Sequence, residues 1–329
     1  MAESLINSIA RLRVLEKKLM TKELVSRLIN APTYDECIRA LRESGFGQSA
    51  QGTDGDMMEA LITAELTDTY SLISELMPKR FAPVTDIFRM RHDLTNIKLL
   101  YKSRMMGEEP SVSSLDLGGV FDSEKLIFSV KKGDYSMLPK KLSDALESLD
   151  VLTYKNRDAR LVSFTLDRAF IEYALTVKSG FVREYFSALA DFTNLISVIR
   201  GVKAEELLPA GAYSKEELIT ISALLYDSPE RIPDLLRTPF DTADVKQAVR
   251  TGFEEYLKTK RISALEKARD EYLITLAMRG RTDIDSPAPI IGFLLAKERE
   301  AEVVRLILTV KRSGIPMSAV DERSVRLYG

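Results

Sequence analysis

The stretch FAPVTDIFRMRHDLTNIKLLYKSRMMGEEP, residues 81–110, has a pattern that recurs twice more in the chain. Residues 178–209 read KSGFVREYFSALADFTNLISVIRGVKAEELLP, and residues 287–316 read PAPIIGFLLAKEREAEVVRLILTVKRSGIP. Each segment has an apolar stretch with an aromatic residue, then an acid, an apolar stretch ending in basic residues, a glycine and a proline. The segments recur about a hundred residues apart. This period is too long for the short solenoid repeats and indicates three copies of one small domain.

Two polar positions recur within these segments. In chain order they are Asp93 with Asn96, Asp191 with Asn194, and Glu300 with Val303. Residues three apart share one face of a helix. A polar pair beside an apolar stripe can bond loop amides or the end of a neighbouring helix. Because buried polar groups need partners, we interpret the pair first as holding the packing inside each repeat and second as a direct contact with a partner.

The periodicity of the chain predicts an all-α fold. The apolar residues Leu5, Ile9, Leu12 and Leu19 recur at helical spacing and are expected on one face. Residues 253–279 are expected to form one long charged amphipathic helix. No run of strict alternation with β-branched residues is long enough to force a sheet.

Capping patterns mark where several helices begin and end. Thr33 with Glu36, and Ser214 with Glu217, have the spacing of a capping box at a helix start. Further stops are expected at Gly45, at Pro78 and at Ser228-Pro229, and a further start near Thr53 and Asp56.

The repeats predict three similar helical domains of about a hundred residues each. We place them at 1–112, 113–211 and 212–329. Three similar bodies in one chain can close around a pseudo-threefold axis, as identical subunits of a ring do, and leave a central funnel. A linear array is the alternative, and it would expose end caps.

Composition narrows the classes of function. The formal net charge of −2 argues against a nucleic-acid binder that works by neutralising phosphates. Cys37 is the only cysteine, so no intrachain disulfide can form, which fits a reducing compartment. The first residues carry charges throughout and lack the apolar core of a secretory signal. The longest charge-free stretch, 286–296, is far short of a spanning helix, so we expect any membrane association to go through a partner or a surface contact.

The sequence offers no catalytic constellation. His92 is the only histidine and adjoins Asp93, but a metal hydrolase needs several such ligands. The glycine-containing segment SGFGQSAQG, residues 44–52, lacks the third glycine of a dinucleotide-binding loop. We therefore predict no catalytic residue, no metal site and no cofactor.

Four segments together resemble the C subunit of bacterial and archaeal V/A-type ATPases, which is homologous to the d subunit of the eukaryotic vacuolar enzyme. They are RLRVLEKKLMTKELVSRLINAPTYDECIRALRESGFG (11–47), DLTNIKLLYKSRMMG (93–107), DFTNLISVIRG (191–201) and IIGFLLAKEREAEVVRLILTVKRSGIP (290–316). The resemblance spans nearly the whole chain and rests on the order and spacing of these segments. Val303 departs from the pattern, so a role of the Asp-x-x-Asn pair is not threefold here.

The resemblance implies a non-catalytic, funnel-like central-stalk subunit, present once per complex. One face would sit on the cytoplasmic side of the proteolipid ring, and the cavity would receive the shaft of rotor subunits D and F. Membrane association would be indirect, through the ring, and ATP hydrolysis or synthesis would be linked to proton or sodium transport. Met105 and Met106 are candidate rim residues, provided that they are not both buried in a domain core.

Three other interpretations stay open. A generic helical scaffold would share the repeats but not the threefold closure. A helical hydrolase would need clustered carboxylates around a metal. A peripheral membrane protein acting alone would bind lipid by itself, for which the near-neutral charge is unfavourable.

Overall fold

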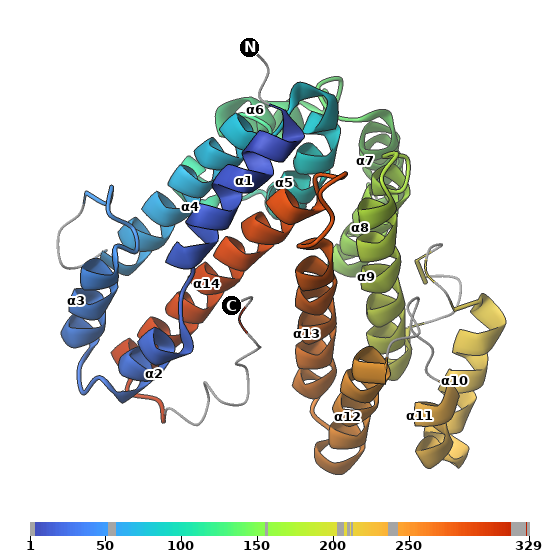
Figure 1. Cartoon of the computed structure of the whole chain (residues 1–329). Helices are drawn as coiled ribbons and strands as arrows, with labels where there is room; N and C mark the ends of the chain where they lie inside the picture. The colour runs from blue at the N-terminus through green and yellow to red at the C-terminus, as the bar shows by residue number, and fades with distance from the viewer. Residues whose placement is uncertain are drawn as a thin grey trace. The chain divides into compact units, whose positions relative to one another are not determined.

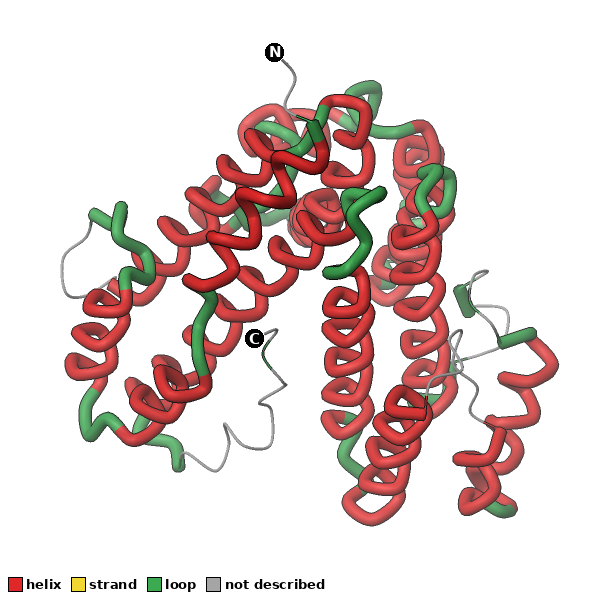
Figure 2. The backbone as a smooth tube through the Cα atoms, in the orientation of Figure 1, coloured by secondary structure: helices red, strands yellow, loops and turns green. Residues whose placement is uncertain are grey.

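The computed structural model describes residues 4–51, 57–154, 157–202, 207, 208, 211, 213–235, 243–316 and 327, apart from the side chains of 226, 233 and 243–250. Regular structure in these residues is helical, and none of them lies in a β-strand (Figure 2). The all-α prediction is therefore confirmed. The chain separates into two compact units: a discontinuous unit of residues 1–82 and 242–329, and a central unit of residues 83–241. The division into three domains stays a prediction.

The discontinuous unit joins helices from the two ends of the sequence. Its α-helices are α1 (Leu5–Leu15), α2 (Lys22–Asn30), α3 (Tyr34–Ser44), α4 (Met57–Leu76), α12 (Ala243–Thr259), α13 (Ser263–Gly280) and α14 (Ala288–Ser313). Helix α14 is buried over most of its length and packs against α4 and α13, with α1 beside it (Figure 1). One apolar cluster contains Leu28, Leu41 and Ile307, so helices of the first fifty residues share a core with α14.

The central unit is built around a cluster of aromatic rings. Its helices are α5 (Ala82–Met106), which begins at the boundary, α6 (Ser123–Lys132), α7 (Lys140–Leu152), α8 (Ala159–Ala174), α9 (Gly180–Ile199), α10 (Lys215–Asp227) and α11 (Ile232–Leu235). The Phe88 ring of α5 lies 4.9 Å from Tyr185 and 5.4 Å from Phe186 of α9, between ring centroids. Phe186 in turn meets Phe170 of α8 edge to face. Such offset and edge-to-face contacts are the favourable geometries for aromatic pairs.

Most of the expected helix ends lie where the caps predict them. The Thr33 hydroxyl accepts the Glu36 N–H at 3.2 Å, and α3 ends at Gly45, whose φ is 86°. Ser214 and Glu217 form both bonds of a capping box at the start of α10. Helix α4 ends at Leu76, just before Pro78, and α10 ends at Asp227, just before Ser228-Pro229. The start expected near Thr53 and Asp56 lies outside the described residues.

Two expectations were wrong. The single helix expected over 253–279 is two helices. The first ends at Thr259, and Lys260 adopts a φ of 57°, in the left-handed region. The break lets α12 fold back and pack along α13. The second concerns Leu19, which does not continue the face of Leu5, Ile9 and Leu12. Helix α1 ends at Leu15, a 3-10 turn follows over Glu16–Lys18, and Leu19 is extended.

Among the described residues, no helix is both long enough and apolar enough to cross a membrane. The candidate rim residues stay candidates, because the Met106 side chain is 61% exposed and Met105 is only partly buried.

Candidate functional site

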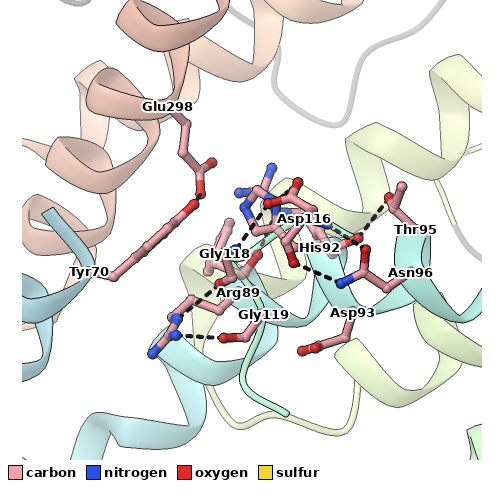
Figure 3. A network of polar contacts seen from close by, with 12 residues as sticks. Tyr70, Arg89, His92, Asp93, Thr95, Asn96, Asp116, Gly118, Gly119 and Glu298 are labelled. Atoms are coloured by element: carbon pink, nitrogen blue, oxygen red, sulfur yellow. Dashed lines mark hydrogen bonds and ion pairs between the residues drawn. The ribbon is translucent and has the colours of Figure 1, made fainter. Parts of the chain in front are cut away.

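The repeated acid and amide of α5 hold the loop that precedes α6 (Figure 3). The Asp93 carboxylate accepts the N–H groups of Val120 at 2.7 Å and Phe121 at 3.3 Å. The Asn96 side chain accepts the N–H of Asp116 and donates to its carbonyl oxygen, each at 2.8 Å. Asp93 and Asn96 are both buried, so these bonds satisfy groups that would otherwise be costly to bury.

Burial raises the pKa of Asp93, and its bonds to the Val120 and Phe121 amides only partly offset the effect. Burial disfavours the charged form of a carboxyl, whereas hydrogen bonds from amides favour it. The loop therefore holds a carboxyl that is easier to protonate than an exposed one.

The second pair repeats this geometry in α9. The Asp191 carboxylate accepts the Tyr213 N–H at 3.2 Å. The Asn194 side chain accepts the N–H of Leu208 at 2.7 Å and donates to the Leu208 carbonyl oxygen at 3.1 Å. Asp191 and Asn194 are buried as well. Both helices thus bind the loop that follows them with the same two side chains.

Glu300 in α14 binds a loop from the opposite end of the sequence. Its carboxylate accepts the Met20 N–H at 2.6 Å, across a separation of 280 residues. Met20 stands immediately before Thr21, whose hydroxyl caps α2. The loop that the third repeat helix binds therefore comes from the first part of the sequence and not from the residues that follow the helix.

The three acids occupy one equivalent position relative to a helix start. Each acid accepts an N–H from the residue directly before an N-cap residue: Phe121, Tyr213 and Met20. Those N-cap residues are Asp122 of α6, Ser214 of α10 and Thr21 of α2. A carboxylate at a helix N-terminus is favoured by the helix dipole. We call these three contacts the acid clasps.

Close packing distinguishes the first two clasps from the third. Gly119 and Gly211 each lie three residues before the N-cap, and a Cβ atom at either would overlap the clasp carboxylate. Lys18 stands at the corresponding place in the third loop. The bulkier loop residue fits the longer reach of Glu300, which has one more methylene group than aspartate. A cavity of about 600 Å³, lined in part by Lys18 and Glu300, lies beside this third clasp.

Glu300 also belongs to a buried ion cluster. The Lys297 ammonium lies 2.7 Å from a Glu300 oxygen and 2.5 Å from a Glu65 oxygen of α4. Burial by itself would lower the pKa of Lys297, but the charges of Glu300 and Glu65 outweigh it and raise that pKa. The lysine therefore stays charged and ties α14 to α4. Val303, at the position of the two asparagines, is buried in the apolar cluster.

His92 and the glycine-containing segment 44–52, which the sequence analysis considered for catalysis, make contacts within the fold. His92 Nδ1 lies 2.6 Å from an Asp116 oxygen, at the first clasp loop (Figure 3). In the described part of the chain, no three His, Cys, Asp or Glu side chains are grouped so that they could hold a metal ion. In the segment 44–52, Gly45 ends α3 and the Gly47 N–H donates to Glu65 at 2.7 Å.

Sequence reasoning found the clasp acids and asparagines and offered loop amides as their partners, but it did not identify which loop residues they bind. The loop residues Val120, Leu208 and Met20 contribute only backbone groups, so their side chains carry no signal. The one signal that was available is the spacing before each N-cap, where D-L-G-G-V-F-D (116–122) and L-P-A-G-A-Y-S (208–214) share a glycine and an aromatic residue.

Comparison with known proteins matches nearly the whole chain to one family. The family model "ATP synthase (C/AC39) subunit" matches residues 8–323. The chain is similar to the C subunit of the A-type ATP synthase of Thermococcus kodakarensis, at 22% identity over 95% of this chain and 88% of that protein. It is also similar to the C subunit of the A-type ATP synthase of Methanocaldococcus jannaschii, at 24% identity over 92% and 81%. A further relative is the C subunit of the V-type sodium ATPase of Enterococcus hirae, at 23% identity over 98% of each chain.

Proposed function

Because this chain belongs to the ATP synthase (C/AC39) subunit family, we propose that it is the central-stalk subunit of a rotary A/V-type ATPase. In this proposal it is a socket that joins the shaft of rotor subunits D and F to the membrane proteolipid ring. Rotation of the shaft then links ATP hydrolysis or synthesis to the transport of protons or sodium ions. One copy would serve each complex, on the cytoplasmic face of the membrane, and it would reach the membrane only through the ring.

The observation that carries the proposal is the extent of the family match. It covers residues 8–323, and the relatives named above are themselves aligned over most of their length. A shared domain inside an unrelated scaffold would instead leave much of one partner unmatched. The generic scaffold is thus the weaker alternative.

The acid clasps would stiffen a subunit that transmits force. A coupling protein must resist bending while it is loaded, so loops between its helices need fixed attachments. Buried hydrogen bonds at Asp93, Asn96, Asp191, Asn194 and Glu300 supply such attachments at equivalent places. We expect each partner contact to bury more than about 1,000 Å², which is the size of a specific protein interface.

The proposed role is non-catalytic. The clasp carboxylates are buried and already accept backbone N–H groups, so they act as anchors within the chain. Nucleotide chemistry would belong to other subunits of the complex.

The first test is purification of the tagged chain from its native membranes in mild detergent, with mass spectrometry of the proteins recovered. The D and F rotor subunits together with the proteolipid are expected. Recovery of the chain alone, or with unrelated proteins, from an extract whose motor is intact would exclude the rotary role.

A second test separates coupling from assembly. Membranes that lack this chain should retain nucleotide hydrolysis by the catalytic head but lose ATP-driven ion transport, and adding back the purified chain should restore it. Transport that persists at the original rate without the chain would contradict the socket.

A further inference from the structure

The end of α7 and the turn after it present three large apolar side chains to solvent. Val151 is 77% exposed, Leu152 is 52% exposed and Tyr154 is 86% exposed. We call residues 151–154 the α7–α8 tip. Single exposed apolar residues are ordinary on protein surfaces, but three within four consecutive positions form a patch, and such patches mark contact sites.

Polar contacts before the tip and within it hold it in place. Before it, the Asp150 carboxylate accepts the hydroxyl groups of Tyr101 and Tyr135, each at 2.9 Å, and also pairs with Arg104. Within it, Thr153 is buried and its hydroxyl donates to the Leu149 carbonyl oxygen at 2.7 Å. The backbone that carries the exposed side chains is therefore tied to α5 and to the α6–α7 connection.

This anchoring lowers the entropy cost of binding through the exposed side chains. Binding costs conformational entropy when side chains or loops must be ordered, and a fixed backbone reduces that cost. Tyrosine is also among the residues that dominate protein interfaces. The α7–α8 tip therefore has the properties of a preorganised contact site.

The charge next to the tip is positive. Arg157 is exposed and has no ion-pair partner among the described residues. The Arg160 side chain is 95% exposed, and the Asp158 carboxylate, 3.8 Å from its Nε, already caps α8 by accepting the Arg160 N–H. Both guanidinium groups are exposed, and arginine binds carboxylates with paired donors.

We propose that the α7–α8 tip docks into an apolar groove of a protein partner whose edge carries carboxylates. The proposal rests on the proposed function, in that the partner is another subunit of the same motor. The fixed backbone at Asp150 and Thr153 favours a protein surface of defined shape over the fluid surface of a bilayer. Val151, Leu152 and Tyr154 fill the groove, and Arg157 and Arg160 pair with its edge.

The test places a photo-crosslinking p-benzoyl-phenylalanine at position 154 of the full chain, within the purified motor. A crosslink to another protein of the motor is expected, at an apolar segment with acidic neighbours. A crosslink to lipid alone, or none in a preparation that contains the motor subunits, would overturn the proposal. If no motor subunit is recovered with the chain, the rotary role fails. The docking proposal then fails with it, because its partner is a subunit of that motor. Failure of docking alone is recognised by the absence of a protein crosslink when the motor subunits are present.

Two variants measure the energetics with the purified partner found by crosslinking. The double variant Val151→Ser with Tyr154→Ser should weaken binding at least about tenfold, as the loss of interface anchors does. The double variant Arg157→Glu with Arg160→Glu should weaken it too and should abolish the weakening that salt causes in the unaltered chain. Unchanged affinity in both variants would rule out the tip as the contact.

A matched control and a lipid assay complete the design. Ile6→Ser alters a side chain that is 65% exposed on α1 and should leave binding unchanged. Thermal unfolding of every variant should match that of the unaltered chain, since the altered side chains are exposed. Sedimentation with vesicles of phosphatidylglycerol and phosphatidylcholine tests the bilayer. Vesicle binding that the Val151→Ser, Tyr154→Ser variant loses would contradict a protein groove.

Discussion

Asn96 binds a single residue of the loop before α6 through both halves of its amide. Asn96→Ala would remove both hydrogen bonds through which a buried side chain holds Asp116, an exposed loop residue. Because an intramolecular hydrogen bond contributes about 1 kcal/mol net, we expect the free energy of unfolding to fall by about 2 kcal/mol in urea titrations. Thr95→Ala, on the exposed side of the same helix, should change it by no more than about 0.5 kcal/mol. Equal effects of the two changes would contradict the role of Asn96 in holding this loop.

Asp93 gives the first clasp a dependence on pH. Since burial raises its pKa in the folded state, the stability that this group contributes is complete below the pKa of the unfolded chain. That contribution is lost as the pH rises through the folded pKa. Asn at this position does not titrate. The stability of the unaltered chain minus that of Asp93→Asn should therefore decrease as the pH rises above about 4, near the usual pKa of aspartate.

Chemical unfolding of both proteins at a series of pH values measures this difference, because other titrating groups cancel between them. A difference that grows with pH would mean that the amide bonds of Val120 and Phe121 outweigh burial. It would reverse the direction assigned to the Asp93 pKa.

At the scale of elements, α12 and α13 pack at a point where only glycine leaves room. A Cβ atom at Gly252 would lie 2.5 Å from the Ala268 Cβ and 3.1 Å from the Ala264 carbonyl oxygen. Gly252→Ala should therefore destabilise the chain by about 1–3 kcal/mol in thermal or chemical unfolding, as overpacking does. In isolation the same change would favour a helix, so the sign of the effect reports the packing.

A second change in the facing helix tests that cause. Ala268→Gly removes the overlapping methyl group and should recover part of the stability lost in Gly252→Ala, despite its own cost of about 1 kcal/mol in helix propensity. If the effects of the two changes on the free energy of unfolding simply add, the contact between α12 and α13 at this point is not the cause of the stability loss.

At the scale of the whole molecule, the third clasp couples the beginning and the end of the sequence, so that each slows hydrogen exchange in the other. Glu300→Ala removes the acceptor of the Met20 N–H and leaves Lys297 with Glu65 alone. Removing one member of a buried ion cluster costs up to about 3–5 kcal/mol, reduced here because Glu65 remains. Hydrogen exchange should therefore speed up in residues 20–31 and in the middle of α14 together, although these segments lie 280 residues apart at the clasp.

Mass spectrometry of exchanged peptides provides the measurement. Asp93→Ala is the matched control, since it opens a clasp of the central unit and should leave the exchange of residues 20–31 unchanged. Faster exchange at only one end of the chain in Glu300→Ala would show that the two ends are held by the apolar core around Leu28 and Ile307 instead.

The helices of this protein and most of their ends were predictable from the sequence, because their causes are local. The Thr33 and Ser214 caps and the Gly45 stop each depend on residues within one turn. The acid of each repeat and the asparagine of the first two were visible because helical spacing places them on one face. The family, too, was recognisable from the order of the segments.

Tertiary structure alone decided what these residues bind and how the chain is divided. The partners of Asp93, Asp191 and Glu300 are backbone N–H groups, which every loop offers, so packing selects among them. Packing likewise let α12 fold back at Lys260, inside a stretch that the sequence predicts as one helix. The third loop comes from the beginning of the sequence because burial brings α1–α4 against α14. Hydrogen bonds and apolar contacts over such separations depend on proximity in space, which periodicity along the chain does not encode.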